Sequence, residues 1–244
     1  MTETQPSVFL CDIEGTVAPI SLVSEQLFPY ARKHLAQYLK ENLTSLEVQN
    51  DLRLLAAENR AEQSPDCPTA GTEIRNELHA RTYLLWLMDQ DRKSTALKSL
   101  QGRIWKAGFE AGELKGTLFE DVPEALTRWS ATGKIAIYSS GSVEAQEFLF
   151  RYTNYGDLTS HIADYFDTRI GAKSMSTSYS FIAGSCGVSP NRVLFFSDVV
   201  RELDAAREAG CQTRLVMRPG NASVGDTNGH NALESLERSA HLIW

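Results

Sequence analysis

The sequence lacks any apolar run long enough to cross a membrane, since none approaches the roughly 18 residues that a spanning helix needs. Its first residues, MTETQPSVFL, have neither the basic segment nor the apolar stretch of a secretory signal peptide. Positive charge is also scarce: 24 Lys and Arg stand against 31 Asp and Glu, which gives a net charge of -7. These absences predict a cytoplasmic protein that binds neither membranes nor nucleic acid.

The four cysteines show no C-x-x-C spacing, which argues against a zinc site or a disulfide framework, and we interpret them as buried thiols. They are Cys11, Cys67, Cys186 and Cys211. With 42% hydrophobic and 23% charged residues, the composition is that of a globular protein, and 244 residues suffice for a core and one inserted domain. A phosphate-bearing partner of so acidic a chain has to be attracted by a local metal or lysine. A small-molecule substrate therefore fits best. We also expect a monomer.

The chain begins with a strand signal and then becomes helical for about a hundred residues. The apolar run Val8 to Cys11 ends abruptly in the polar segment DIEGT, which is typical of a buried parallel strand that leads into a loop. From about Leu22 to Gly116, apolar residues recur at helical spacing. Within this stretch, Thr44-Ser45-Leu46-Glu47 has the pattern of a capping box. Further helices are expected over 74–88 and 94–106.

After Gly116 the pattern alternates between strand and helix, which predicts a parallel sheet covered on both faces. Asp121 is expected to cap the first of these helices. The expected strands cover 134–138, 193–197 and 213–216, with a short strand near Arg169-Ile170, and the expected helices cover 143–151, 176–186 and 201–209. The predicted fold is therefore α/β, with a core formed by residues 1–20 and 117–244 and an inserted all-helical domain formed by residues 21–116.

Reactive side chains follow the ends of these strands, where open α/β sheets bind their ligands. Asp12 and Glu14 follow the first strand, Ser139 and Ser140 the second, and Asp198 that of 193–197, while Lys173 lies just past the short strand. Each motif alone has an ordinary explanation: DIEGT and the serines make turns, and a single lysine is usually solvated. Their order along the chain, each at a strand end, is harder to ascribe to coincidence.

Together these residue types suit the hydrolysis of a phosphate ester. A carboxylate such as Asp12 can attack phosphorus if a cation screens the two negative charges, and Mg²⁺ commonly takes one or two carboxylates, here Asp12 and Asp198. Glu14 can protonate the leaving alkoxide and then deprotonate water, and its backbone carbonyl can reach the metal. Ser139 and Lys173 can hold phosphoryl oxygens. Glu202 either anchors a metal-bound water or orients the loop, or it is simply an acid in the first turn of a helix, where it favours the helix dipole.

The chain resembles the enolase-phosphatases of the haloacid dehalogenase superfamily over nearly its whole length. The strings that carry the resemblance are DIEGT, LFPYA, LQGRIW, GFEAGELK, YSSGSVEAQ, GAK, SDVVREL and RPGN. Glu14 stands where most relatives in the superfamily carry aspartate. The chain departs from the family at Val17-Ala18-Pro19, where many relatives have small hydroxylic residues, and this departure bears on substrate positioning.

The resemblance implies a Rossmann-like core with a helical cap and one Mg²⁺ per subunit. It also implies a role in methionine salvage, in which 2,3-diketo-5-methylthiopentyl-1-phosphate is enolised and then dephosphorylated to an acireductone. By position, Asp12 is the nucleophile and a metal ligand, Glu14 the acid/base and a ligand through its carbonyl, and Asp198 a metal ligand. Ser139, Ser140 and Lys173 bind phosphate or substrate, Lys173 as a catalytic residue. The base of the enolisation is open among Glu14, Lys98 and Glu113.

Three other hypotheses fit parts of the sequence. The first is a broad-specificity sugar-phosphate phosphatase of the same superfamily, without an enolase step. The second is a catalytically inactive relative that senses a phosphorylated metabolite, although every acidic and basic position is filled. The third treats the helical insertion as a platform for a partner protein.

Overall fold

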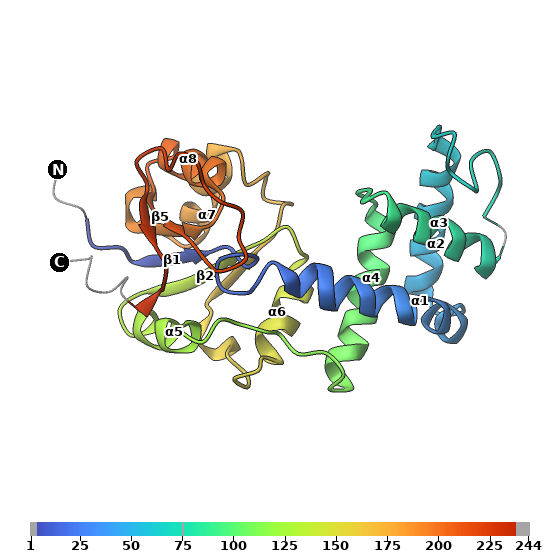
Figure 1. Ribbon diagram of the computed structural model, residues 1–244, viewed down its shortest axis with the longest axis horizontal. Helices are drawn as coiled ribbons and strands as arrows, with labels where there is room; N and C mark the ends of the chain where they lie inside the picture. Colours follow the sequence, from blue (N-terminus) through green and yellow to red (C-terminus); the bar gives the residue numbers. More distant parts are fainter. Residues whose placement is uncertain (1–3, 75, 238–244) are drawn as a thin grey trace. The chain divides into compact units, whose positions relative to one another are not determined.

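The computed structural model describes residues 4–74 and 76–237. It divides the chain into two compact units, one formed by Met1–Val23 with Lys115–Trp244 and the other by Ser24–Leu114 (Figure 1). These bounds fall within a few residues of the predicted domain boundaries. That the two units are separate folding domains stays a prediction.

The first unit is built on a six-stranded sheet whose strands are all parallel and lie in the order β3-β2-β1-β4-β5-β6. This arrangement confirms the predicted α/β class. The strands are β1 (Val8–Cys11), β2 (Lys134–Tyr138), β3 (Asp164–Phe166), β4 (Val193–Ser197), β5 (Gln212–Val216) and β6 (Asn231–Leu233). β1 and β4 are buried along their whole lengths, as their continuous apolar runs require.

Helices cover both faces of this sheet, with α7 and α8 on one face and α5 and α6 on the other (Figure 1). They are α5 (Val122–Ser130), α6 (Val143–Arg151), α7 (Ser176–Ser185) and α8 (Val200–Glu208), and 3₁₀ turns lie at η2 (Thr159–His161) and η3 (Pro190–Arg192). On the α5 face, Trp129 stacks between Phe9 at 5.2 Å and Phe196 at 4.8 Å between ring centroids. The alternation of side chains along β1 and β4 thus gives each helical layer its own apolar surface.

The second unit consists of helices joined by loops and has no strand among its described residues. A π-helical segment, η1 (Leu22–Leu27), leads into it, and its helices are α1 (Phe28–Asn42), α2 (Leu46–Ala61), α3 (Glu77–Asp89) and α4 (Thr95–Glu110). Its core is a cluster of aliphatic and aromatic side chains drawn from all four helices, including Leu35, Leu55, Leu84 and Leu100. The all-helical insertion predicted from the 3.6-residue periodicity is therefore present.

Three local predictions are wrong. The short strand is Asp164–Phe166 and not near Arg169-Ile170, because the Asp167 carboxylate accepts from the backbone N–H of Arg169 at 2.9 Å and turns the chain. Ser45, and not Thr44, caps α2 by accepting from the N–H of Val48 at 3.2 Å. Asp121 precedes α5 but makes no cap hydrogen bond, since Arg218 holds its carboxylate at 2.8 Å.

All four cysteines are buried free thiols, as predicted. In the described part of the chain, no helix combines the length and apolar character that crossing a bilayer would take.

Trp129→Ala tests the aromatic layer. Trp129 is 2% exposed and contacts rings on both β1 and β4, so we expect its loss to lower the free energy of unfolding by about 3–5 kcal/mol. Phe181, which is 64% exposed on α7, is the matched control, and its change to alanine should alter stability by less than about 0.5 kcal/mol. Urea denaturation measures both values, and equal losses would contradict the packing described.

Candidate active site

Asp12 opens a tight loop at the carboxyl end of β1. Its backbone N–H still donates to Phe196 of β4 at 3.0 Å, and its own Oδ1 accepts from the N–H of Ile13 at 2.7 Å. The loop then folds back on itself, with the N–H of Gly15 donating to the carbonyl of Ala18 at 2.7 Å. Gly15 has φ +73°, a conformation that a side chain would strain. The glycine of DIEGT is thus what lets the chain turn directly after Asp12.

Lys173 reaches this loop from the other side and binds Asp12. Its Nζ lies 2.5 Å from Oδ1 of Asp12 and 2.9 Å from Oε2 of Glu202, with only 11% of the side chain exposed. Burial acts to lower the pKa of Lys173, but the charges of Asp12 and Glu202 outweigh it and hold the pKa above its ordinary value. The ammonium is therefore a fixed positive charge beside the proposed nucleophile.

The backbone that carries Lys173 is held by three side-chain hydroxyls. Tyr138 donates to the carbonyl of Gly171 at 2.9 Å, Ser178 to that of Ala172 at 2.8 Å, and Tyr179 to that of Lys173 itself at 2.7 Å. Both tyrosines belong to the buried core of the α/β unit. The lysine loop has little strand or helix of its own, and these bonds fix its position on β2 and α7.

Glu202 contacts both Lys173 and the end of β4. Besides binding Lys173, its Oε2 accepts from the hydroxyl of Ser197 at 3.1 Å, and that hydroxyl in turn accepts from the N–H of Val199. In this structure Glu202 therefore orients the lysine and the end of β4.

Glu14 and Ser139 meet on the β2 side of the loop. The Ser139 hydroxyl lies 3.5 Å from Oε2 of Glu14 and accepts from the N–H of Gly141 at 3.1 Å. Ser139 is buried, whereas Ser140 is exposed beside it. Burial, followed by the charge of Asp12, raises the pKa of Glu14 to about 7. A carboxyl with this pKa populates both its acid and base forms near neutral pH.

Asp198 lies on the β4 side, close against Gly15. A Cβ atom at Gly15 would come within 2.3 Å of Oδ2 of Asp198, so only glycine permits this approach. Burial, followed by the charge of Asp12, raises the pKa of Asp198 to about 6. The structure thus brings Asp12, Glu14, Ser139, Lys173 and Asp198 together at one edge of the sheet.

The balance of charge at this edge favours a cation. Four carboxylates, those of Asp12, Glu14, Asp198 and Glu202, lie near the ammonium of Lys173, and burial, followed by the charge of Asp12, raises the pKa values of the last three acids. Among the described residues no three His, Cys, Asp or Glu side chains are arranged to hold a metal ion. The predicted ligands need only two side chains, since Glu14 contributes its backbone carbonyl. Hard oxygen donors with excess negative charge fit Mg²⁺.

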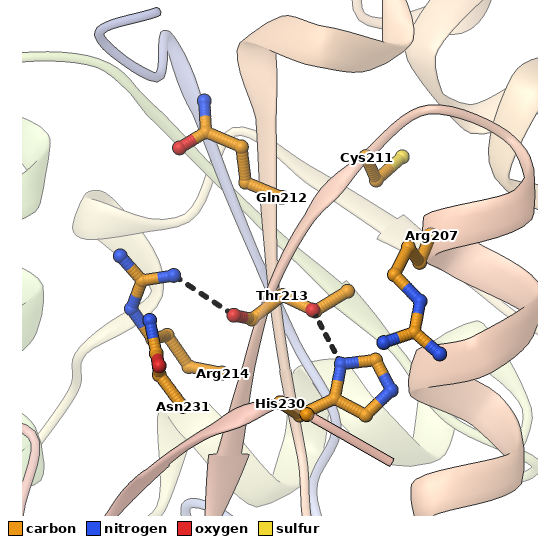
Figure 2. Close-up of a pocket in the computed structure, with 8 residues that line it drawn as sticks. Arg207, Cys211, Gln212, Thr213, Arg214, His230 and Asn231 are labelled. Atoms are coloured by element: carbon orange, nitrogen blue, oxygen red, sulfur yellow. Dashed lines mark hydrogen bonds between the residues drawn. The ribbon is translucent and has the colours of Figure 1, made fainter. Parts of the chain in front are cut away.

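A hollow of about 210 Å³ lies away from these residues, at the start of β5 (Figure 2). There the Thr213 hydroxyl and His230 Nδ1 are 2.7 Å apart, and His230 Nε2 is 3.1 Å from Asp204, an order that parallels the Ser-His-Asp triad of hydrolases. Asp204 is, however, also bound by Arg207 and Asn228, and Thr213 is only 9% exposed. We interpret the network as a connection that holds β6 to β5.

The sequence did not indicate which residues support the site. The tyrosines that hold the Lys173 loop are core residues by pattern, and only their hydroxyl groups could have suggested more, since buried Tyr O–H groups usually find a partner. Arg218 and Asn221 were noted only as part of RPGN, yet both bind the DIEGT loop, Arg218 Nε through the carbonyl of Thr16 at 3.0 Å and Asn221 Nδ2 through that of Gly15 at 2.8 Å.

A family model for haloacid dehalogenase-like hydrolases matches residues 6–210, and the chain therefore belongs to this class of enzymes. Within the class it belongs to the enolase-phosphatase E1 family. It is 50% identical over 233 residues to enolase-phosphatase E1 of Synechococcus elongatus, covering 94% of this chain and 97% of the relative. The protein of that name from Leptospira borgpetersenii is 45% identical over 235 residues, covering 94% and 96%.

Two further likenesses agree with this assignment. A Physcomitrium patens protein named a probable bifunctional methylthioribulose-1-phosphate dehydratase/enolase-phosphatase E1 is 45% identical over 96% of this chain and 48% of its own length. Among solved structures, the UTR4 protein of Saccharomyces cerevisiae superposes with a TM-score of 0.79 at 35% identity, covering 95% of this chain and 98% of that one. The chain is thus an enzyme, a phosphatase of the enolase-phosphatase kind.

The raised carboxyl pKa values predict that the metal-free protein loses stability as pH rises. Because the folded-state values of Glu14 (about 7) and Asp198 (about 6) exceed the ordinary 4.5 and 3.8, ionisation costs more in the folded state. Their contribution to stability is complete below about pH 4 and is lost between about pH 4 and 7. Glu14→Gln, which stays neutral, should flatten this decline. Thermal unfolding in chelator at pH 5 and pH 8 measures it, and a variant with the wild-type slope would refute the assignment.

Proposed function

We propose that Asp12, Glu14, Ser139, Ser140, Lys173 and Asp198 form the active site for the enolase-phosphatase activity, with 2,3-diketo-5-methylthiopentyl-1-phosphate as substrate. The observation that carries the proposal is the buried contact of 2.5 Å between Lys173 Nζ and Asp12 Oδ1, beside a glutamic acid whose pKa is about 7. The chain's 50% identity to an enolase-phosphatase E1 supports the choice of substrate.

In the phosphatase step, a carboxylate oxygen of Asp12 attacks phosphorus while the bond from phosphorus to the ester oxygen breaks. Glu14, in its acid form, gives its proton to that departing oxygen, so the leaving group does not depart as an unstabilised anion. Glu14 is then a carboxylate and takes a proton from water, whose oxygen attacks the phosphorus of the aspartyl-phosphate. Inorganic phosphate departs, and Asp12 is regenerated.

The phosphoryl oxygens are bound by the groups that surround Asp12. Lys173 neutralises the nucleophile and the phosphoryl group together, since its ammonium already lies against Asp12. The Ser139 hydroxyl, which points to Glu14 in this structure, can turn its proton to a phosphoryl oxygen, and Ser140 is exposed beside it. The donors stand in place before the substrate arrives, so little reorganisation is needed during transfer.

Mg²⁺ is the proposed cofactor, one per subunit, held by the carboxylates of Asp12 and Asp198 and the backbone carbonyl of Glu14. When bound, the ion supplies positive charge that screens the nucleophile from the phosphate and favours the enolate form of the diketone. Support comes from the excess of carboxylates over cationic side chains at this edge.

For the enolase step we propose Glu14 as the base. In its ionised form it removes the proton from the carbon that bears the phosphate ester and returns a proton to the neighbouring carbonyl oxygen, which gives the enol. A pKa of about 7 leaves enough of each protonation state for both steps. The other two candidates for the base lie in the helical unit. The Glu113 carboxylate accepts from the hydroxyl of Tyr30 at 2.9 Å, and Lys98 lies in the first turn of α4.

An assay of the order of events separates this function from a broad-specificity phosphatase. Purified protein is incubated with the diketo phosphate and Mg²⁺ while enol absorbance and free phosphate are followed together. We expect the enol to appear before phosphate, and the diketo phosphate to be preferred over generic sugar phosphates. Phosphate release without an enol, at equal rates for generic esters, would favour the alternative. A monomeric state and a cytoplasmic location stay predictions, the first of which sedimentation tests.

Asp12→Asn should abolish turnover and leave the fold intact, because it removes the nucleophile's charge but keeps its shape. We expect phosphate release to fall by more than about 10³-fold. Asp66→Asn, an exposed substitution of the same kind in the helical unit, is the control and should keep wild-type activity. Wild-type turnover by the Asp12 variant would remove the nucleophile from the proposal.

Asp198→Asn should remove the response of the protein to Mg²⁺. At concentrations about 100-fold above its dissociation constant, Mg²⁺ should stabilise the wild type by about 2.7 kcal/mol, or some 5–10 °C in melting temperature. The variant should show almost no shift, and calorimetric titration should detect no binding. An undiminished shift would show that the ion binds somewhere else.

A further inference from the structure

The loop after β5 contacts the DIEGT loop and donates hydrogen bonds to two successive backbone carbonyls of that loop. Arg218 donates from Nε to the carbonyl of Thr16 at 3.0 Å, and Asn221 donates from Nδ2 to that of Gly15 at 2.8 Å. Gly15 and Thr16 follow Glu14 without a gap, so these two bonds fix the peptides next to the proposed acid/base. Neither side chain is among the groups assigned above to bind phosphate or metal.

Arg218 is itself rigidly held. It is 8% exposed, its guanidinium lies 4.4 Å above the ring of Phe119, and Nη1 donates to Asp121 at 2.8 Å. The same Asp121 oxygen accepts from the hydroxyl of Ser235 at 3.0 Å and from the N–H of Leu236 at 2.6 Å. Burial acts to raise the pKa of Asp121. The hydrogen bond and charge of Arg218 and the hydrogen bond from Leu236 outweigh it, so the pKa lies below its ordinary value. The Thr16 carbonyl is therefore tied to the start of α5.

Asn221 and Asp198 both approach Gly15 on the side where a Cβ atom would lie. A Cβ atom at Gly15 would lie 2.3 Å from Oδ2 of Asp198 and 3.1 Å from Nδ2 of Asn221, so the amide and the carboxylate flank the same glycine. A hollow of about 110 Å³ beside them is lined in part by Asp198, Arg218 and Asn221. The loop is thus clamped at the point where it approaches the proposed metal ligand of β4.

We propose that Asn221 and Arg218 are positioning residues, which set the distance between the DIEGT loop and Asp198 through the carbonyls of Gly15 and Thr16. Asn221 acts mainly on the site, because the hydrogen bond that its side chain donates ends on the DIEGT loop. Arg218 acts on the site and also on stability, because its ion pair with Asp121 is buried. The inference rests on the proposed roles of Asp12, Glu14 and Asp198.

Asn221→Ala is the decisive variant, with Asn231→Ala as its control, since Asn231 is an exposed asparagine at the start of β6. We expect Asn221→Ala to lower kcat about 10- to 100-fold, as loss of a supporting hydrogen bond at a catalytic site does, with KM changed less than about 2-fold. Its melting temperature should stay within about 3 °C of the wild type. Asn231→Ala should match the wild type in all three.

Arg218→Lys separates the two duties of the arginine. A lysine keeps the positive charge for Asp121 but cannot donate to Asp121 and the Thr16 carbonyl in the same planar arrangement. We therefore expect the variant to fold and to lose kcat as Asn221→Ala does. Wild-type kcat in both variants, or a loss of activity that follows the loss of folded protein alone, would overturn the proposal.

Each rate is measured with p-nitrophenyl phosphate as well as with the diketo phosphate. Positioning of the DIEGT loop affects both substrates, so the inference predicts parallel losses. If the wild type hydrolyses only the generic ester, the proposed substrate is wrong, while the effect of Asn221 on kcat still stands or falls by itself.

Discussion

The structure of the α/β unit depends on one electrostatic constraint: several buried or half-buried carboxylates lie together at the carboxyl edge of a parallel sheet, with one ammonium among them. Lys173 lies 2.5 Å from Asp12 and 2.9 Å from Glu202, while the pKa values of Glu14 and Asp198 stay raised. Like charges held this closely favour the binding of a cation, and together with burial they leave part of the Glu14 population protonated near neutral pH. Both effects are what phosphoryl transfer to a carboxylate requires.

The fold meets this constraint by drawing the groups from separate elements. β1 delivers Asp12, β2 delivers Ser139, β4 delivers Asp198, and α8 delivers Glu202, so neighbouring strands of the order β2-β1-β4 converge on one point. Lys173 comes from a loop that the hydroxyls of Tyr138 and Tyr179 fasten to the core. Activity and stability are therefore coupled, because the groups that position the site are also part of the packed interior.

Much of this arrangement could be predicted from the sequence where one pattern dominates. Strands 134–138 and 193–197 were predicted with their observed bounds, since apolar runs end there in polar turns. The prediction of a strand near Ile170 was wrong because the side chain of Asp167 determines where the chain turns. Asp121 looked like a helix cap, and its partner Arg218 lies 97 residues away in the sequence. Such long-range partners, and the choice between two roles for Glu202, depend on tertiary structure that no local pattern carries.

Trapping the covalent intermediate tests the central claim most directly. The protein is mixed with the diketo phosphate and Mg²⁺, quenched in acid during turnover, digested and examined by mass spectrometry. The account predicts one added phosphoryl group on the peptide that contains Asp12, and none in a sample without substrate. Turnover with a phosphoryl group on another residue, or with none on any peptide, would contradict it.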